Sequence, residues 1–193
     1  VCEMAESLVL DLVDKELVTD QMVLTVGYDV TSLSDPAVAA RYRGPMRTDS
    51  YGRRLPRHAH GTINMEGMTS SSKKLCQSVM GLYDSIVDRR LLVRRINISA
   101  NHIVKKDSVR AEEMAEQLSL LDSVGGDGPF KASGDAGISR ESIEDELERE
   151  RKVQETVLRI KKKFGKNALV KGMSLEEGAT AMERNRQIGG HKA

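Results

Sequence analysis

The stretch Gln21-Met22-Val23-Leu24-Thr25-Val26-Gly27-Tyr28 alternates between two kinds of side chain. Successive side chains of a strand point to opposite faces, so residues two apart share a face. One face would carry Met22, Leu24, Val26 and Tyr28. The other would carry Gln21, Thr25 and Gly27, together with Val23. This pattern predicts a strand with one buried face and one solvent-exposed face, as in an antiparallel sheet covered on one side.

Two helical patterns accompany this strand. Residues 3–18 predict a helix because apolar residues recur along one face: Ala5, Leu8, Leu12 and Val13. A second helix is predicted from the N-cap candidates at 69–72 through Val87. Its apolar stripe comprises Leu75, Val79, Leu82 and Ile86. Between these helices, residues 29–52 are rich in Asp, Ser, Pro and Gly and predict a loop.

Two further strands are expected. One runs from Leu55 to Met65, where Pro56 favours a sheet edge or a strand start. In the other, Leu92, Ile96 and Ile98 alternate with Val93, Arg95, Asn97 and Ser99. Helices alternating with one-sided strands predict an α+β fold, a small antiparallel sheet with two helices packed on one face. The open face would then carry Arg95, Asn97, Ser99 and Asn101.

Charge is distributed in blocks along the 193 residues, although the net charge is only +1. Residues 1–110 carry +3, residues 111–150 carry −9 and residues 151–193 carry +7. Such segregation favours a nucleic-acid-facing domain followed by an extended interaction region. The composition indicates a folded domain over residues 1–106, a segment over 107–122 and a flexible acidic linker over 123–140. A long charged helix is predicted over 141–165, and a tail that orders on a partner over 166–193.

Six arginines and one acidic residue lie between residues 41 and 60. Arginine presents a planar fork that matches phosphate oxygens, and clustered cations release counterions from a nucleic-acid backbone. The predicted DNA-binding residues are Arg53, Arg54, Arg57, His58, His60, Lys73, Lys74, Arg94 and Arg95. A solvated basic loop is the alternative. Aromatic residues make up only 3% of the chain, which favours contact with backbone phosphates over base stacking.

A five-residue motif, Gln117, Leu118, Ser119, Leu120 and Leu121, precedes Asp122 and a glycine-rich run. It resembles the sliding-clamp-binding peptide of bacterial DNA polymerases and repair factors. The glutamine amide would bind at one end of a surface groove while the leucines insert into it. Alternatively, Met114, Leu118 and Leu121 lie at i, i+4 and i+7 and could close an amphipathic helix.

The sequence predicts neither a catalytic site nor a metal site. His58 and His60 have the spacing of a metal pair, but no third ligand lies near them in the sequence. No nucleophile array or phosphate loop is visible, so neither an activity nor a cofactor is predicted. Cys2 and Cys76 lack redox spacing and indicate a reducing cytoplasm. No signal peptide or membrane span is predicted, and the start at Val1 suggests a piece of a longer chain.

Several segments resemble the C-terminal region of Y-family translesion DNA polymerases of the ImpB/MucB/SamB (UmuC-like) type, particularly Gram-positive members. They are residues 10–15, 19–21, 25–29, 58–62, 91–96, 166–168 and 189–193. The resemblance implies that residues 1–106 form a little finger, a β-α-β-β-α-β domain that grips template–primer duplex. The first strand of that domain would be missing, which would leave a sheet edge unpaired. The catalytic palm with its Mg²⁺ carboxylates would also lie outside this chain.

The leading hypothesis is therefore a non-catalytic part of a damage-bypass polymerase that binds duplex DNA and a sliding clamp. A stand-alone nucleic-acid adaptor is one alternative, and an interaction protein built on the charged helix is another. Further expected partners are a recombinase or accessory protein at the tail, and a second copy of the chain at the unpaired sheet edge.

Overall fold

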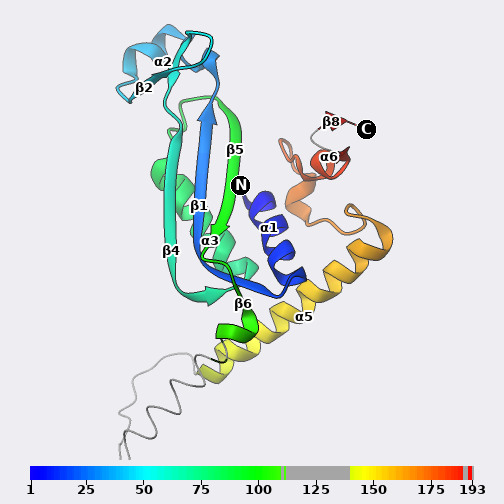
Figure 1. Cartoon of the computed structure of the whole chain (residues 1–193). Coiled ribbons are helices and arrows are strands. Elements are labelled where there is room, and N and C mark those ends of the chain that lie inside the picture. Colours follow the sequence, from blue (N-terminus) through cyan, green and yellow to red (C-terminus); the bar gives the residue numbers. More distant parts are fainter. Residues whose placement is uncertain (110, 112–139, 189–190, 193) are drawn as a thin grey trace, which may run out of the picture.

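The computed structural model describes residues 1–109, 111, 140–188 and 191–192. It shows an α+β fold in which a small antiparallel sheet is covered on one face by helices and is followed by a long charged helix (Figure 1). The predicted fold class is confirmed. Most of segment 107–122 and nearly all of the linker lie outside the described residues, including the whole clamp-binding motif.

Strand β1 (Leu17–Tyr28) is the central strand of the main sheet. It pairs antiparallel with β4 (Ala59–Thr69) on one side and with β5 (Val93–Asn101) on the other. The short strand β6 (Val104–Lys105) pairs with the start of β1. The predicted apolar face of β1 is buried, because Met22, Leu24, Val26 and Tyr28 are all core residues.

Helices α1 (Cys2–Asp14) and α3 (Ser72–Ile86) pack on this apolar face and on each other. The core joins Val9 and Leu12 of α1 to the predicted stripe of α3. Full burial of such side chains contributes roughly 1.5–3 kcal/mol each. The sheet approaches α3 closely at Gly61, where an added Cβ would lie 2.8 Å from Leu82 Cδ1. Any larger residue at this position of β4 would have to displace the ends of the Leu82 and Ile86 side chains.

The first predicted helix is four residues too long. It ends at Asp14, and the chain turns through Lys15 and Glu16, whose φ is 55°. Leu17 and Val18 instead begin β1 and pair with β6. Val18 is buried and has the same strand parity as Met22. Sheet pairing therefore overrides a helical pattern that these two residues could also have continued.

The predicted loop and the strand after it contain more structure than the sequence indicated. Asp29 and Asp35 cap η1 (Val30–Leu33) and α2 (Pro36–Arg41) through their side chains. Strand β2 (Met46–Thr48) then pairs with β3 (Arg54–Pro56) in a separate hairpin. We call residues 36–57 the basic lobe. It lies beyond the end of β1 (Figure 1), and Pro56 ends its hairpin instead of marking an edge of the main sheet.

The alternation in the last long strand predicts that Leu92 faces the core, but 58% of its surface is exposed. The register between β1 and β5 shifts between Gly27 and Tyr28, so that Tyr28 pairs with Val93. As a result Leu91, which precedes the strand, turns into the core instead. An extra residue in one strand of an antiparallel pair changes the face of the residues beyond it.

Helix α5 (Arg140–Phe164) packs along α1, and Gly165 follows it with a φ of 99°. The tail contains η2 (Gly172–Leu175), α6 (Ala181–Asn185), β7 (Gln187–Ile188) and β8 (His191–Lys192). It returns to α1 of the same chain, where Lys171 Nζ lies 2.5 Å from Glu6 Oε1 (Figure 1). The composition of the tail predicts that it orders on a partner, whereas the described residues show it against this helix.

Candidate nucleic-acid interface

The face of the sheet opposite the helices is exposed and polar. β5 contributes Arg95, Asn97, Ser99 and Asn101 to it, as predicted. An amide row crosses three strands here, because Gln21 Nε2 donates to Asn64 Oδ1 (2.7 Å) and Asn101 Nδ2 donates to Gln21 Oε1 (2.9 Å). Two rows further along the same face, Thr25 Oγ1 and His60 Nδ1 are 2.9 Å apart. These contacts hold polar groups in place on a surface that water or a ligand can reach.

Arg95 stands at the basic-lobe end of this face. It pairs with Gly27 across the sheet, where an added Cβ would lie 3.6 Å from the Cβ of Arg95. Arg54, Arg57 and Arg95 are exposed and form no ion pair with the residues that the structure describes. Their guanidinium groups therefore keep their hydrogen-bond donors for an external partner.

Arg53 is placed differently from these three arginines. It forms an ion pair with Asp49 across the hairpin turn (2.8 Å) and lies 5.1 Å from the centre of the Tyr51 ring. Hydrogen bonds from the Thr31 amide and hydroxyl hold the pKa of Asp29 below its usual range, and the nearby cations Arg94 and Arg53 lower it further. Part of the Arg53 charge is therefore already balanced by Asp49.

Lys73 and Lys74 lie away from the arginines. The basic lobe precedes β4 and α3 follows it, so the 11 residues of β4 separate the two ends by about 36 Å. Lys73 belongs to the first turn of α3, where its Nζ contacts Glu146 of α5 at 2.8 Å. The hydrogen bond to Glu146 and its negative charge raise the pKa of Lys73.

The N-terminus of α3 is covered by the acidic half of α5. Glu150 accepts hydrogen bonds from Ser71 Oγ (2.6 Å) and from the Lys73 amide (3.1 Å). Gln154, of which 6% is exposed, donates to the Ser70 carbonyl (3.0 Å) and to Ser72 Oγ (2.9 Å). Free amides at a helix N-terminus can bind phosphate, and the sequence predicted Lys73 and Lys74 at this helix end to bind DNA. In the structure, a carboxylate of the same chain holds the position.

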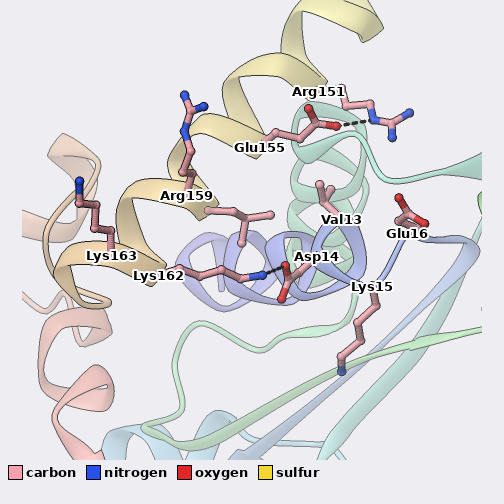
Figure 2. A pocket seen from close by; sticks show the side chains of 10 residues that line it. Val13, Asp14, Lys15, Glu16, Arg151, Glu155, Arg159, Lys162 and Lys163 are labelled. Carbon is pink, nitrogen blue, oxygen red and sulfur yellow. Dashed lines mark hydrogen bonds and ion pairs between the residues drawn. The ribbon is translucent and has the colours of Figure 1, made fainter.

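The basic half of α5 crosses the end of α1 and forms a cleft of about 670 Å³ with the turn that follows α1. Lys162 forms an ion pair with Asp14 across the cleft, and Arg151 pairs with Glu155 along α5 at 2.8 Å. The side chains of Arg159 and Lys163 point away from α1 (Figure 2). The cleft is a packing contact between helices, and two ion pairs join four of its eight charged residues.

The two histidines and the two cysteines complete the set of predicted candidates. The rings of His58 and His60 meet edge to face, with centroids 6.5 Å apart. Among the described residues, no group of three or more His, Cys, Asp or Glu is placed to hold a metal ion. Burial raises the pKa of the Cys76 thiol to about 12, so little reactive thiolate forms at neutral pH.

The sequence did not reveal the amide row formed by Gln21, Asn64 and Asn101. Each residue has the strand parity of the open face, but their alignment depends on the register between three strands. The sequence could therefore place these residues on the open face but could not align them with one another. Known proteins give no further guidance, because no family model, no curated protein and no solved structure matches this chain. No helix in the described part of the chain is long and apolar enough to cross a membrane.

Proposed function

We propose that this chain is a cytoplasmic, non-catalytic part of a Y-family translesion DNA polymerase and binds duplex DNA through the open face of its sheet. The observation that carries the proposal is the combination of this exposed polar face with three uncommitted arginines at its end, Arg54, Arg57 and Arg95. The residues that resemble the family support the same assignment.

The chemistry of the face suits phosphate contact. Guanidinium, amide and hydroxyl groups all donate hydrogen bonds to phosphate oxygens, and such contacts position a protein on a duplex without reading its sequence. Among the strand residues on the open face there is no Phe, Tyr or Trp on which an unpaired base could stack. Duplex DNA is therefore a better match than single-stranded nucleic acid.

A direct test is the affinity of the whole chain for labelled duplexes of two unrelated sequences, measured by fluorescence anisotropy across a salt series. We expect equal affinities for the two sequences. The slope of log affinity against log salt should be about −2.7 or steeper, because three phosphate contacts contribute about 0.9 each. A preference for one sequence, or for single strands of the same length, would contradict the proposal.

We further propose that Gln117 to Leu121 binds a sliding clamp. This segment lies outside the described residues, and the motif supports the proposal through the sequence alone. Replacing Leu120 and Leu121 with alanine removes two inserted side chains, each contributing roughly 1.5–3 kcal/mol if fully buried. We expect clamp affinity to fall at least about a hundredfold with no change in the melting temperature. A lower melting temperature would instead assign both leucines to the core.

A further inference from the structure

A groove lies between α1, α5 and the tail, on the side of the helical layer away from the sheet. Its volume is about 790 Å³, within the range of binding pockets in proteins. Its apolar lining includes Leu10 of α1, Val153 and Val157 of α5, and Leu169 of the tail. Val153 is 62% exposed and Leu169 is 41% exposed, so a substantial apolar surface in this groove meets water.

The charges around the groove are unevenly neutralised. Among the acids on the α1 side, Glu6 and Asp14 are paired with Lys171 and Lys162, whereas Asp11 has no ion pair with described residues. Lys161 and Lys166 on the opposite side form no ion pair with described residues. The chain from residue 151 onward carries +7, which adds to the positive field around the groove.

Two buried polar atoms at the tail end of the groove lack hydrogen-bond partners among the described residues. They are Glu3 Oε1 and Arg184 Nε, and both residues line the groove. The closest Glu3–Arg184 contact is a long one of 3.9 Å. A buried donor and acceptor without partners cost free energy, and a polar side chain entering the groove would satisfy them.

We propose that this groove binds an acidic amphipathic helix of another protein. Two roughly adjacent helices present an apolar furrow that a third helix can fill with residues at i, i+3, i+4 and i+7. Glutamate or aspartate on the flanks of that helix would face Lys161 and Lys166. The acidic half of α5 from a second copy is a poor occupant, because Glu146 and Glu150 already bind Lys73 and Ser71 within their own chain.

The test uses the full chain and three labelled 18-residue synthetic peptides. The first peptide has leucines at i, i+3, i+4 and i+7 among glutamates, the second replaces the glutamates with lysines, and the third scrambles the first. We expect the first to bind at least about tenfold more tightly than the others. Equal affinity for all three would overturn the proposal.

Variants of the chain locate the site. Val153→Glu and Lys161→Glu should each weaken binding of the acidic peptide, the former by about tenfold. Leu175→Glu and Lys163→Glu are matched controls, because these exposed residues lie outside the groove, and both should change affinity less than about twofold. Circular dichroism checks that each variant is folded.

The proposal would also be overturned if Val153→Glu and Leu175→Glu weakened binding of the acidic peptide equally. It would likewise be overturned if duplex DNA abolished peptide binding at equal ionic strength. If Val153→Glu abolished self-association in sedimentation while no peptide bound, the occupant would be a second copy and the proposal would be wrong. Duplex affinity of Val153→Glu should equal that of the parent chain, so this test is independent of DNA binding.

Discussion

The basic side chains of this protein differ in whether their charged groups are already paired or are available to a binding partner. The arginines of the basic lobe belong to one sequence cluster, yet Arg53 is bound to Asp49 while Arg54 and Arg57 are exposed without an ion pair in the described structure. The ammonium group of Lys73 forms an ion pair with Glu146, and its backbone amide donates a hydrogen bond to Glu150. Cations that already have a carboxylate partner contribute less to binding a phosphate, because that pairing has to be replaced.

This difference predicts the salt dependence of duplex binding. Replacing Arg57 and Arg95 together with alanine should flatten the slope of log affinity against log salt by about 1.8, from two contacts at about 0.9 each. Lys73→Ala is the control and should leave the slope unchanged, since Lys73 pairs with Glu146 at the other end of β4. An unchanged slope in the double variant would remove both arginines from the interface, and a flatter slope for Lys73→Ala would place α3 within it.

The Cys76 thiol should be unreactive in the folded protein. Burial raises its pKa to about 12, and the thiolate is the reactive form. In a Cys2→Ser background, iodoacetamide should label Cys76 at pH 8 much faster in denaturant than in buffer. Because the folded state holds this proton more tightly, the thiol's contribution to stability is present below pH 9 and falls as pH rises from about 9 to about 12. Equal labelling rates would show that the thiol is accessible.

At the scale of elements, the position of α5 depends on a few polar contacts. The exposed residues of α5 include the apolar Val153 and Phe164, so burial of its apolar stripe is incomplete. Gln154, Glu150 and Lys162 connect it to α3 and α1. Among these, Gln154 is the buried residue, and its amide serves two oxygens at the start of α3.

Gln154→Ala should therefore loosen α5. Removing the amide leaves the Ser70 carbonyl without this donor, which costs about 1–3 kcal/mol when the site stays buried. We expect faster hydrogen exchange at the α5 amides and at the Lys73 amide, together with a lower urea midpoint. Thr156→Ala on the exposed side of α5 is the control and should exchange like the parent chain. If Gln154→Ala also exchanges like the parent, the helix is held by its other contacts.

At the scale of the whole molecule, the described part of the main sheet ends on both sides in strands with one partner each. Within the described residues, β4 and β5 pair only with β1. The sequence predicted Pro56 at an edge or at the start of a strand of this sheet, but it pairs with Met46 inside the basic lobe. Backbone groups on an unpaired edge are a ready template for another strand.

We therefore expect the chain to self-associate at high concentration through an edge of this sheet. Analytical sedimentation should show association that increases with the concentration of the chain. Ser99→Lys, which adds charge to β5, should reduce association, whereas Thr156→Lys on α5 should not. Monomeric behaviour at every concentration would show that neither edge is available.

Local patterns of side chains determine much of this fold. The alternation in β1 defines its buried face, and the stripe from Leu75 to Leu82 defines the buried face of α3. Asp29, Asp35 and Ser71 mark the starts of η1, α2 and α3, and Gly165 marks the end of α5. These features follow from side-chain periodicity and backbone preferences within about 10 residues, so they can be read without knowing what lies across the fold.

Only the tertiary structure decided the features that connect distant residues. The register shift at Gly27 exposes Leu92, the pairing with β6 turns Leu17 and Val18 into strand, and Glu150 covers the start of α3. The groove beside α1 likewise requires three segments that are far apart in the chain. Each depends on which surfaces pack best once the whole chain is assembled, and a sequence window contains only one side of such a contact.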